Sequence, residues 1–172
     1  MLFRSRAWVS QEGNLFATLL LQAPPATSAQ LCFAAGLAVG ETVAAYAPNA
    51  EVTLKWPNDV LLDGRKAAGI LLQQEGAMLA VGIGVNLASH PEGTEFPAVS
   101  VNAATGNAPE PGAALHRLAG RMAAWYEVWR TQGFRPVRDA WLARAACLGK
   151  EIRARLTNGE DRKSTRLNSS HT

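Results

Sequence analysis

Two short segments of the chain combine positive charge, a carboxylate, an amide and glycine at a spacing suited to chemistry on anions. The first is Lys55-Trp56-Pro57-Asn58-Asp59, and the second is Gly64-Arg65-Lys66-Ala67-Ala68-Gly69. A carboxylate and a phosphate repel each other, so a site that joins them needs positive charge fixed at the junction. Lys66 suits this role, because it follows a glycine turn where a strand begins and a rigid backbone can aim it. The alternative interpretation is a solvated lysine of a hairpin.

Lys55 and Asp59 are expected to form an ion pair across the turn between them. Lys55 alternates with Leu54 and Trp56, and a lysine in such a strand is usually exposed at an edge or paired with a carboxylate. Asp59 follows across the turn and is the obvious partner. Pro-Asn-Asp also favours turns for conformational reasons alone, but that explanation leaves the preceding Lys-Trp unaccounted for.

Glycines interrupt the apolar strand segments that follow. Gly69 lies in the segment after Lys66, while Gly82 and Gly84 belong to Gly-Ile-Gly-Val-Asn, which ends at Asn86. Glycine weakens a strand, so it marks a bulge or the close approach of another group. A ligand lying against the backbone and tight packing between sheet and helix would both explain these positions.

The hydrophobic pattern predicts the elements that carry these residues. Residues 15–21 form a nearly continuous apolar run, typical of a strand buried on both faces. A helix capped by Thr27 or Ser28 is expected to run to about Tyr46. Its apolar stripe consists of Leu31, Ala34, Ala35, Ala38 and Thr42. Further strands are expected over residues 52–56, 60–62, 66–74 and 79–87, with a tight hairpin at Asp63-Gly64.

The second half of the chain is expected to be mainly helical. Residues 88–110 are rich in Pro, Gly, Ser, Asn and Thr, which predicts a loop with at most a short helical turn. Amphipathic helices are expected over residues 112–132 and 136–146. The stripe of the first consists of Leu115, Leu118, Met122, Trp125 and Trp129. Because short turns join successive strands into a meander, the predicted class is α+β, with a mixed or antiparallel sheet flanked by helices.

Composition narrows the classes of function. The hydrophobic content of 48% is enough for a core. The longest apolar runs are broken by Gly, Glu or Lys before they could span a bilayer, and no signal peptide is visible, so a cytoplasmic protein without a membrane partner is expected. Cys32 and Cys147 lack metal-ligand spacing and the histidines are scattered, so no metal site is predicted.

The two ends of the chain differ from the rest. Residues 1–5 and 161–172 resemble the translation of a sequencing adapter read on opposite strands, and they are excluded from fold reasoning as artefacts. They hold four of the 17 basic residues and one of the 14 acidic ones, so the remaining residues carry 13 of each sign. The alkaline pI of 9.2 therefore gives no support for nucleic-acid binding.

Taken together, the motifs resemble the signature of biotin protein ligases. Lys-Trp-Pro-Asn-Asp, Gly-Arg-Lys-x-x-Gly and Gly-Ile-Gly-Val-Asn stand in the family's order and at hairpin spacing. The resemblance implies the sheet of that family's catalytic domain, related in fold to class II aminoacyl-tRNA synthetases and followed by a small β-barrel. Residues 6–148 are then expected to be the catalytic domain without its N-terminal part, and residues 149–160 the start of the barrel.

The resemblance also implies a reaction. Family members use ATP and Mg²⁺ to convert biotin to biotinyl-AMP, and they transfer the biotin to a lysine of a biotin carboxyl carrier protein, the acetyl-CoA carboxylase subunit. Biotin, ATP and this carrier are the expected partners, without a tightly bound prosthetic group. A lipoate ligase shares the fold and a similar Asn-Asp…Gly-Arg-Lys-x-x-Gly stretch, but Lys55-Trp56-Pro57 favours biotin. A non-catalytic fragment that binds biotin, or a repressor fragment, is the other alternative.

Residue roles follow from the same resemblance. Lys66 is the catalytic lysine, in contact with the biotin carboxylate and the phosphate. The nucleotide and acyl-phosphate side is lined by Lys55, Asn58 and Asp59. The biotin head and the adenylate lie against Gly69, Gly82 and Gly84, while Asn86 contacts the adenine.

Arg6 and Trp8 match the end of the family's ligand loop, where the tryptophan packs beside the adenine. That loop normally begins with a Gly-Arg-Gly-Arg run, which does not precede Arg6. The upstream strand with its Thr-Asn biotin contact is missing as well. The chain is therefore expected to be an incomplete ligase without activity of its own.

Overall fold

The computed structural model describes residues 11–94 and 96–146 in full, and the backbone alone of residues 152–155 and 161–164. The strands are β1 (Leu15–Gln22), β2 (Val52–Lys55), β3 (Asp59–Leu62), β4 (Arg65–Glu75), β5 (Met78–Val85), β6 (Ile152–Arg155) and β7 (Asp161–Ser164). The helices are α1 (Leu31–Tyr46), α2 (Val101–Thr105), α3 (Pro111–Gln132) and α4 (Phe134–Leu142), and a 3₁₀ turn (Ser28–Gln30) precedes α1.

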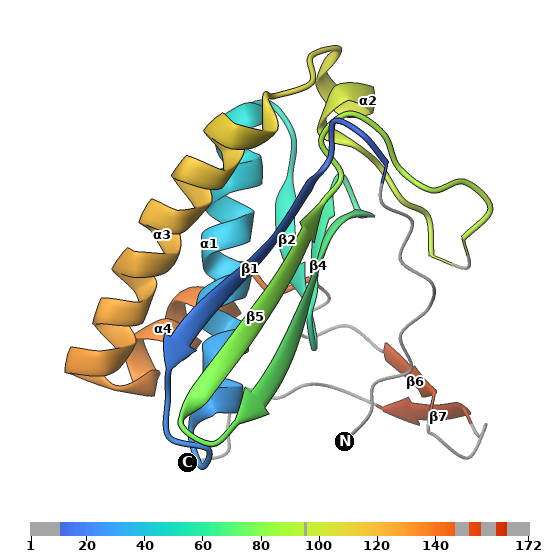
Figure 1. The fold of residues 1–172 in the computed structure, drawn as a ribbon. Helices are drawn as coiled ribbons and strands as arrows, with labels where there is room; N and C mark the ends of the chain where they lie inside the picture. The colour runs from blue at the N-terminus through green and yellow to red at the C-terminus, as the bar shows by residue number, and fades with distance from the viewer. Residues whose placement is uncertain (1–10, 95, 147–151, 156–160, 165–172) are drawn as a thin grey trace.

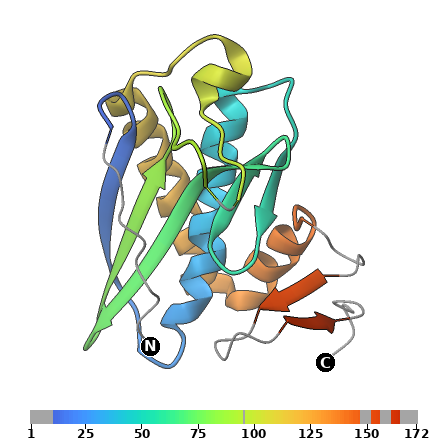
Figure 2. The same cartoon turned by 90° about the vertical axis from the view of Figure 1, so that its right-hand side faces the viewer.

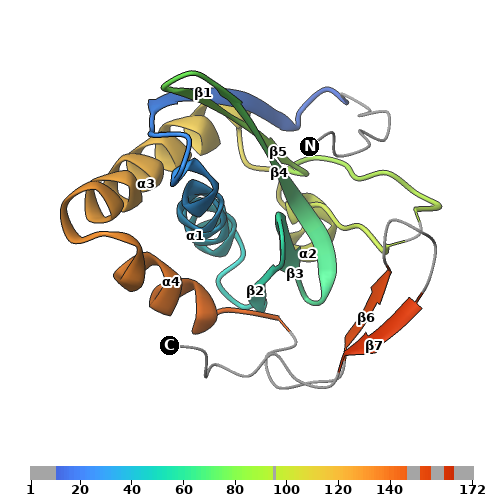
Figure 3. The same cartoon turned by 90° about the horizontal axis from the view of Figure 1, so that it is seen from below.

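One antiparallel sheet and a layer of helices make up the main body. The strand order is β1-β5-β4-β3-β2. Strands β2 to β5 therefore form the predicted meander, and β1 is added at its edge beside β5. Helices α1 and α3 lie together against one face of the sheet, with α4 beside them (Figure 1, Figure 3). The predicted α+β class is confirmed.

Helix α1 is the centre of the core. The five residues of its predicted stripe are all buried, and so are Leu37, Val39 and Val43 on its other sides. The segment Ser28–Tyr46 is long and apolar enough to cross a membrane, which the interrupted apolar runs did not suggest, but most of it is buried inside the fold. Glu41, its one charged residue, is bracketed by Arg121 and Arg144 at 3.7 and 3.5 Å. These features are those of the core helix of a globular domain.

The start of α1 corrects a prediction. Neither Thr27 nor Ser28 caps the helix, because their hydroxyls donate instead to the carbonyls of Pro24 and Pro25. These bonds close turns over the two prolines, and the helix begins only at Leu31. Hydroxyl residues favour such local bonds wherever the backbone turns, so the cap signal was a turn signal.

Strand β1 also differs from its prediction. The run is not buried on both faces, because β1 lies at the edge of the sheet and its residues alternate between the core and solvent. Leu15 is buried and Leu20 is 68% exposed. Residues 15–21 lack the alternation of polarity that would have revealed this, since apolar residues occupy both faces.

The later helices agree with their periodicity except at one position, but α4 ends at Leu142, before the predicted end at residue 146. Leu118 and Met122 of α3 are buried, whereas Leu115, which was placed on the same stripe, is 39% exposed. Glu110 caps α3 by accepting a hydrogen bond from the backbone N–H of Ala113 at 2.8 Å, and Pro111 occupies the first helical position. The predicted loop contains the short helix α2.

Beyond α4, residues 152–155 form strand β6, within the residues expected to begin the barrel. It pairs antiparallel with β7, with Ile152 opposite Ser164 and Arg155 opposite Asp161. Strand β7 lies within the residues that were set aside as an artefact, and nothing in the pairing tests their origin. Figure 2 shows β6 and β7 as the two red strands, which follow the orange helix α4 along the chain.

Stability should depend on α1 far more than on the exposed side of α3. Leu37→Ala is expected to lower the free energy of unfolding by about 2–5 kcal/mol, because the fully buried side chain leaves a cavity. Leu115→Ala, the matched control on an exposed helical site, should change it by about 0.5 kcal/mol or less. Urea denaturation followed by circular dichroism measures both, and equal losses would contradict the position of the core.

Candidate active site

A row of residues crosses the whole sheet and brings the predicted site residues together. The strand register places Phe16 opposite Gly84, Gly84 opposite Gly69, Gly69 opposite Asp59, and Asp59 opposite Lys55. Residues opposite each other in antiparallel strands share one face of the sheet. The row thus holds a lysine and a carboxylate at one end, and its middle consists of backbone alone.

This row lies on the face turned away from α1 and α3, called the outer face below. The adjacent row, one residue along each strand, consists of buried core residues: Leu15, Val85, Ala68, Val60 and Leu54. Because successive side chains of a strand point to opposite faces, Lys55 and Asp59 point away from the core. The glycines at 69 and 84 therefore form a floor on the outer face beside the charges.

Lys66 reaches the outer face through a β-bulge. Val60 is opposite Ala68, but the next residue, Leu61, is opposite Lys66, so Ala67 is an extra residue in β4. In a strand without the bulge, regular alternation from Gly69 would turn Lys66 toward the helices, since a shift of one residue reverses the face. Bulges of this kind redirect side chains near functional sites. The sequence marked Gly69 as a bulge candidate, whereas the bulge lies two residues earlier.

Asp59 forms its ion pair with Lys66. The Lys66 Nζ lies 2.5 Å from the Asp59 Oδ1, with the two side chains 34% and 19% exposed. The same oxygen is buried and accepts no well-directed hydrogen bond within the described ranges, so the lysine charge is what compensates its burial. The predicted Lys55–Asp59 partnership is replaced by this pair. Lys55 is opposite Asp59 in the sheet, but its Nζ lies over the Phe96 ring, 2.9 Å from the centroid.

The backbone of Lys66 is held from outside the sheet. Its N–H donates to the Pro97 carbonyl at 2.8 Å, and its carbonyl accepts from the Val99 N–H at 3.0 Å. These bonds form a parallel bridge between Lys66 and Ala98. A lysine at the irregular end of a strand is thus fixed on both sides, which lets the backbone aim the charge.

Two predicted polar contacts serve the backbone in this structure. Asn58 Nδ2 donates to the Ile70 carbonyl at 2.8 Å, and the Ile70 N–H donates back to the Asn58 carbonyl at 2.9 Å. Asn86 Nδ2 donates to the carbonyls of Val99 and Lys66 at 3.2 and 3.4 Å. Both asparagines therefore brace the segment around the bulge, and whether they contact a nucleotide stays a prediction.

The remaining predicted residues divide between the site and its margin. Gly82 is opposite Thr18 and Leu71, in the outer-face row next to the charged one. A Cβ at Gly82 would meet Leu71 at an ordinary 3.7 Å, so packing does not demand glycine there. Arg6 and Trp8 lie outside the described residues.

Sequence reasoning missed the support beneath the Lys55–Asp59 turn. Trp56 is 59% exposed but stacks at 5.3 Å on Phe33 of α1, and Phe33 contacts Trp141 of α4 at 5.2 Å. The Cys32 Sγ donates to the Pro57 carbonyl at 3.3 Å. The aromatic content of α4 was visible in the sequence, but nothing there indicated that it packs under this turn.

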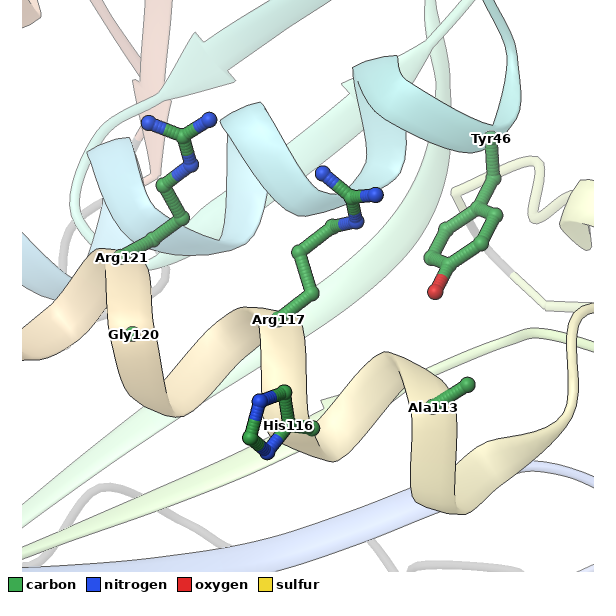
Figure 4. A pocket seen from close by; sticks show the side chains of 6 residues that line it. All are labelled: Tyr46, Ala113, His116, Arg117, Gly120 and Arg121. Carbon is green, nitrogen blue, oxygen red and sulfur yellow. The ribbon is translucent and has the colours of Figure 1, made fainter.

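A hollow of the helix layer is separate from this site. It is lined by Tyr46 at the end of α1 and by residues along α3, and it has a volume of about 640 Å³. Figure 4 shows Arg117 and Arg121 rising from α3, and the Arg117 guanidinium lies 5.6 Å from the Tyr46 ring centroid. Since α1 and α3 cover the opposite face from Lys66, this hollow does not belong to the charged row.

The described part of the chain contains no group of three or more His, Cys, Asp or Glu side chains placed to hold a metal ion. The charged row instead offers an ammonium beside a carboxylate, with a glycine floor next to them. That arrangement can hold an anionic group against the sheet and stabilise negative charge that develops there.

Comparison with known proteins identifies the family. The sequence profile of the Biotin/lipoate A/B protein ligase family matches residues 4–87. The biotin--[acetyl-CoA-carboxylase] ligase of Paracoccus denitrificans is 45% identical over 170 residues, an alignment that covers 91% of this chain and 71% of that protein. The chain belongs to the biotin protein ligase family. The Bacillus subtilis bifunctional ligase/repressor BirA is 31% identical, and this chain spans about half of it (51%).

Solved structures agree with the assignment to the biotin protein ligases. The biotin protein ligase from Aquifex aeolicus in complex with biotin and ATP matches with a TM-score of 0.80 and 26% identity, covering 94% of this chain and 70% of that one. The Leishmania major ligase in complex with biotin, 21% identical with a TM-score of 0.75, supports the fold alone. The predicted family resemblance is confirmed.

Cys32 should make stability depend on alkaline pH. Burial, and secondly the Asp59 carboxylate, raise the pKa of the Cys32 thiol from 9.0 to about 11. The unfolded thiol ionises first, so the stability contributed by the neutral thiol should be lost as the pH rises from 9.0 to about 11. We expect the urea midpoint to fall less over this window in Cys32→Ala than in the parent, measured in a Cys147→Ala background. Parallel curves would contradict it.

Proposed function

We propose that this ligase activates biotin with MgATP as the nucleotide substrate, forms biotinyl-AMP, and transfers biotin to a lysine of a biotin carboxyl carrier protein. The observation that carries the proposal is the Lys66–Asp59 pair on the outer face beside the floor of Gly69 and Gly84. The 45% identical relative is named as a ligase for acetyl-CoA carboxylase, which supports the same acceptor here.

In the first step, a biotin carboxylate oxygen attacks the α-phosphorus of ATP. A new P–O bond forms while the bond to the β-phosphate oxygen breaks, and pyrophosphate leaves with that electron pair. Lys66 stays protonated and faces the oxygens where negative charge accumulates. Asp59 holds the Lys66 ammonium in place until the substrates arrive. In the second step, the neutral amine of the carrier lysine attacks the carbonyl carbon of the anhydride. A C–N bond forms while the bond from the carbonyl carbon to the phosphate oxygen breaks, AMP leaves with that electron pair, and the amine loses a proton to solvent.

The other site residues receive supporting roles in this proposal. Lys55 supplies a second positive charge at the end of the row for the phosphates. Gly69 and Gly84 let the planar parts of the substrate approach the backbone, because a side chain on either would stand in the row. The ligand-loop residues Arg6 and Trp8 would cover the adenylate.

The domain limits are proposed on the same basis. Residues 6–148 correspond to the catalytic domain and residues 149–160 to the start of a C-terminal domain, with residues 1–5 and 161–172 foreign to the natural protein. Sequencing the source DNA across both junctions tests these limits. A continuous reading frame that encodes the present ends would overturn them. The cytoplasm is the proposed compartment.

Removal of Lys66 tests the mechanism. In the full-length protein, Lys66→Ala should slow formation of biotinyl-AMP by about 100-fold or more, because losing a preorganised donor costs about 3 kcal/mol in the transition state. Arg65→Ala is the matched control: this neighbour is exposed and makes no ion pair that we observe within the described ranges, so it should retain nearly full activity. Pyrophosphate release from biotin and ATP is measured. Near-normal turnover of the Lys66 variant would remove this lysine from the mechanism.

Competition should separate biotin from lipoate, since the matching family profile includes ligases for both. We expect a large excess of lipoate to leave the rate of biotin adenylation unchanged, because Lys-Trp-Pro precedes Asn58 as in the biotin ligases. The measurement is biotinyl-AMP yield at limiting biotin. Preferential formation of lipoyl-AMP would assign the chain to the lipoate branch.

A further inference from the structure

One asparagine outside the charged row makes an unusual number of hydrogen bonds to a single loop. The Asn14 Oδ1 accepts from three successive backbone N–H groups, those of Leu87, Ala88 and Ser89, at 2.9, 2.9 and 3.1 Å. Its Nδ2 donates to the Ser89 carbonyl at 3.0 Å. A turn of three converging N–H groups is the geometry that proteins use to hold an anion. Here a neutral amide fills it, so the loop is clamped to the start of β1.

The residue before Asn14 is pressed against the same loop. Gly13 has a φ of +83°, and a Cβ built there would lie 2.8 Å from the Ala88 Cβ. Both the backbone conformation and the lack of space require glycine at this position. The Gly13-Asn14 turn and the loop over residues 87–89 therefore fit together closely, with 73 to 75 residues of sequence between the partners.

The clamped loop continues directly into the support of Lys66. The residue before it, Asn86, donates its backbone N–H to the Ala67 carbonyl in the bulge at 2.8 Å. Its side-chain amide donates to the carbonyls of Lys66 and Val99, and the Val99 N–H donates to the same Lys66 carbonyl. A continuous set of hydrogen bonds thus runs from Asn14 through Asn86 to the backbone of Lys66.

We infer that Asn14 is a positioning residue for Lys66, which it holds in register through the loop over residues 87–89 and through Asn86. The inference rests on the proposed function, in which Lys66 must meet the reacting oxygens. The bulge removes the regular ladder at the place where the lysine must be aimed, so its orientation relies on bonds from neighbouring segments. A displacement of about 1 Å at such a group can cost about 100-fold in rate.

Three variants test this role. Asn14→Ala removes every bond to the loop. Asn14→Asp keeps an oxygen for the three N–H groups and loses the amide donor to the Ser89 carbonyl and hydroxyl. Asn102→Ala is the matched control, because the Asn102 side chain touches the same loop through a single 3.4 Å bond from its Nδ2 to the Ala88 carbonyl and has no bond to the bulge that we observe in the described residues. The bond from its backbone N–H to the Leu87 carbonyl is kept in this variant.

Backbone amide exchange is the first measurement, since it does not depend on activity. In Asn14→Ala, exchange should accelerate at residues 87–89 and also at the N–H groups of Lys66, Asn86 and Val99. Asn14→Asp should return the latter three close to their original rates, and Asn102→Ala should leave them unchanged. Acceleration confined to residues 87–89 would overturn the inference, because the clamp would then be local.

Biotin adenylation by the full-length protein is the second measurement, normalised to folded protein. We expect kcat of Asn14→Ala to fall about 10- to 100-fold, the range of small misplacements, while the KM for biotin changes less than about twofold and Asn14→Asp recovers most of the rate. Unchanged kcat in Asn14→Ala would overturn the inference while leaving the proposed function intact. If the parent itself forms no biotinyl-AMP, the proposed function fails, and the exchange pattern still decides whether Asn14 holds Lys66. Should Asn14→Ala not fold, Asn14→Ser, whose shorter side chain withdraws the oxygen from the three N–H groups, is measured in its place with the same expected results.

Discussion

The ion pair between Lys66 and Asp59 is the constraint around which the rest of the site is arranged. Both side chains are partly buried on a sheet otherwise made of apolar strands and glycine, and a buried charge without a partner is costly. Each group therefore needs the other in the unliganded protein. The pair forms only because the bulge at Ala67 brings Lys66 to the face that Asp59 occupies. A regular strand would have placed the ammonium among the core residues of α1.

The antiparallel sheet can carry such a site, because one of its faces packs on the core while the other faces water. One row of side chains packs on α1 and forms the core, and the row beside it carries Lys55, Asp59 and the glycines, while the bulge brings Lys66 to the same face. Packing on the helix side fixes the register of all five strands. That register alone then sets the relative positions of Lys55, Asp59, Gly69 and Gly84.

Sequence alone gave the elements and the residue types of the site, but not the pairing between them. Turn residues, glycines and apolar periodicity are local signals, so the strands and the helices were largely predictable, and the role of Lys66 stays a prediction. The choice of partner for Asp59 was not, because two lysines lie at similar separations along the chain and only the bulge decides between them. The edge position of β1, the contact of Cys32 with Pro57 and the clamp of Asn14 all join distant segments, and no local pattern reports them. The function itself came from resemblance in three motifs, since charge and glycine spacing alone indicate anion chemistry without naming the acid.

Both lysines of the site lie where the sheet borrows a strand-like segment from elsewhere. Lys66 forms a parallel bridge with Ala98, and Leu54, next to Lys55, forms one with Ala145 after α4. The Leu54 N–H donates to the Arg144 carbonyl at 2.8 Å, and its carbonyl accepts from the Ala146 N–H at 2.7 Å. The Lys66 backbone is thus held directly by the added segment, whereas the backbone of Lys55 is held through its neighbour Leu54. The ammonium groups then move mainly through their own side-chain torsions, so the backbone rearranges little when anionic substrates bind.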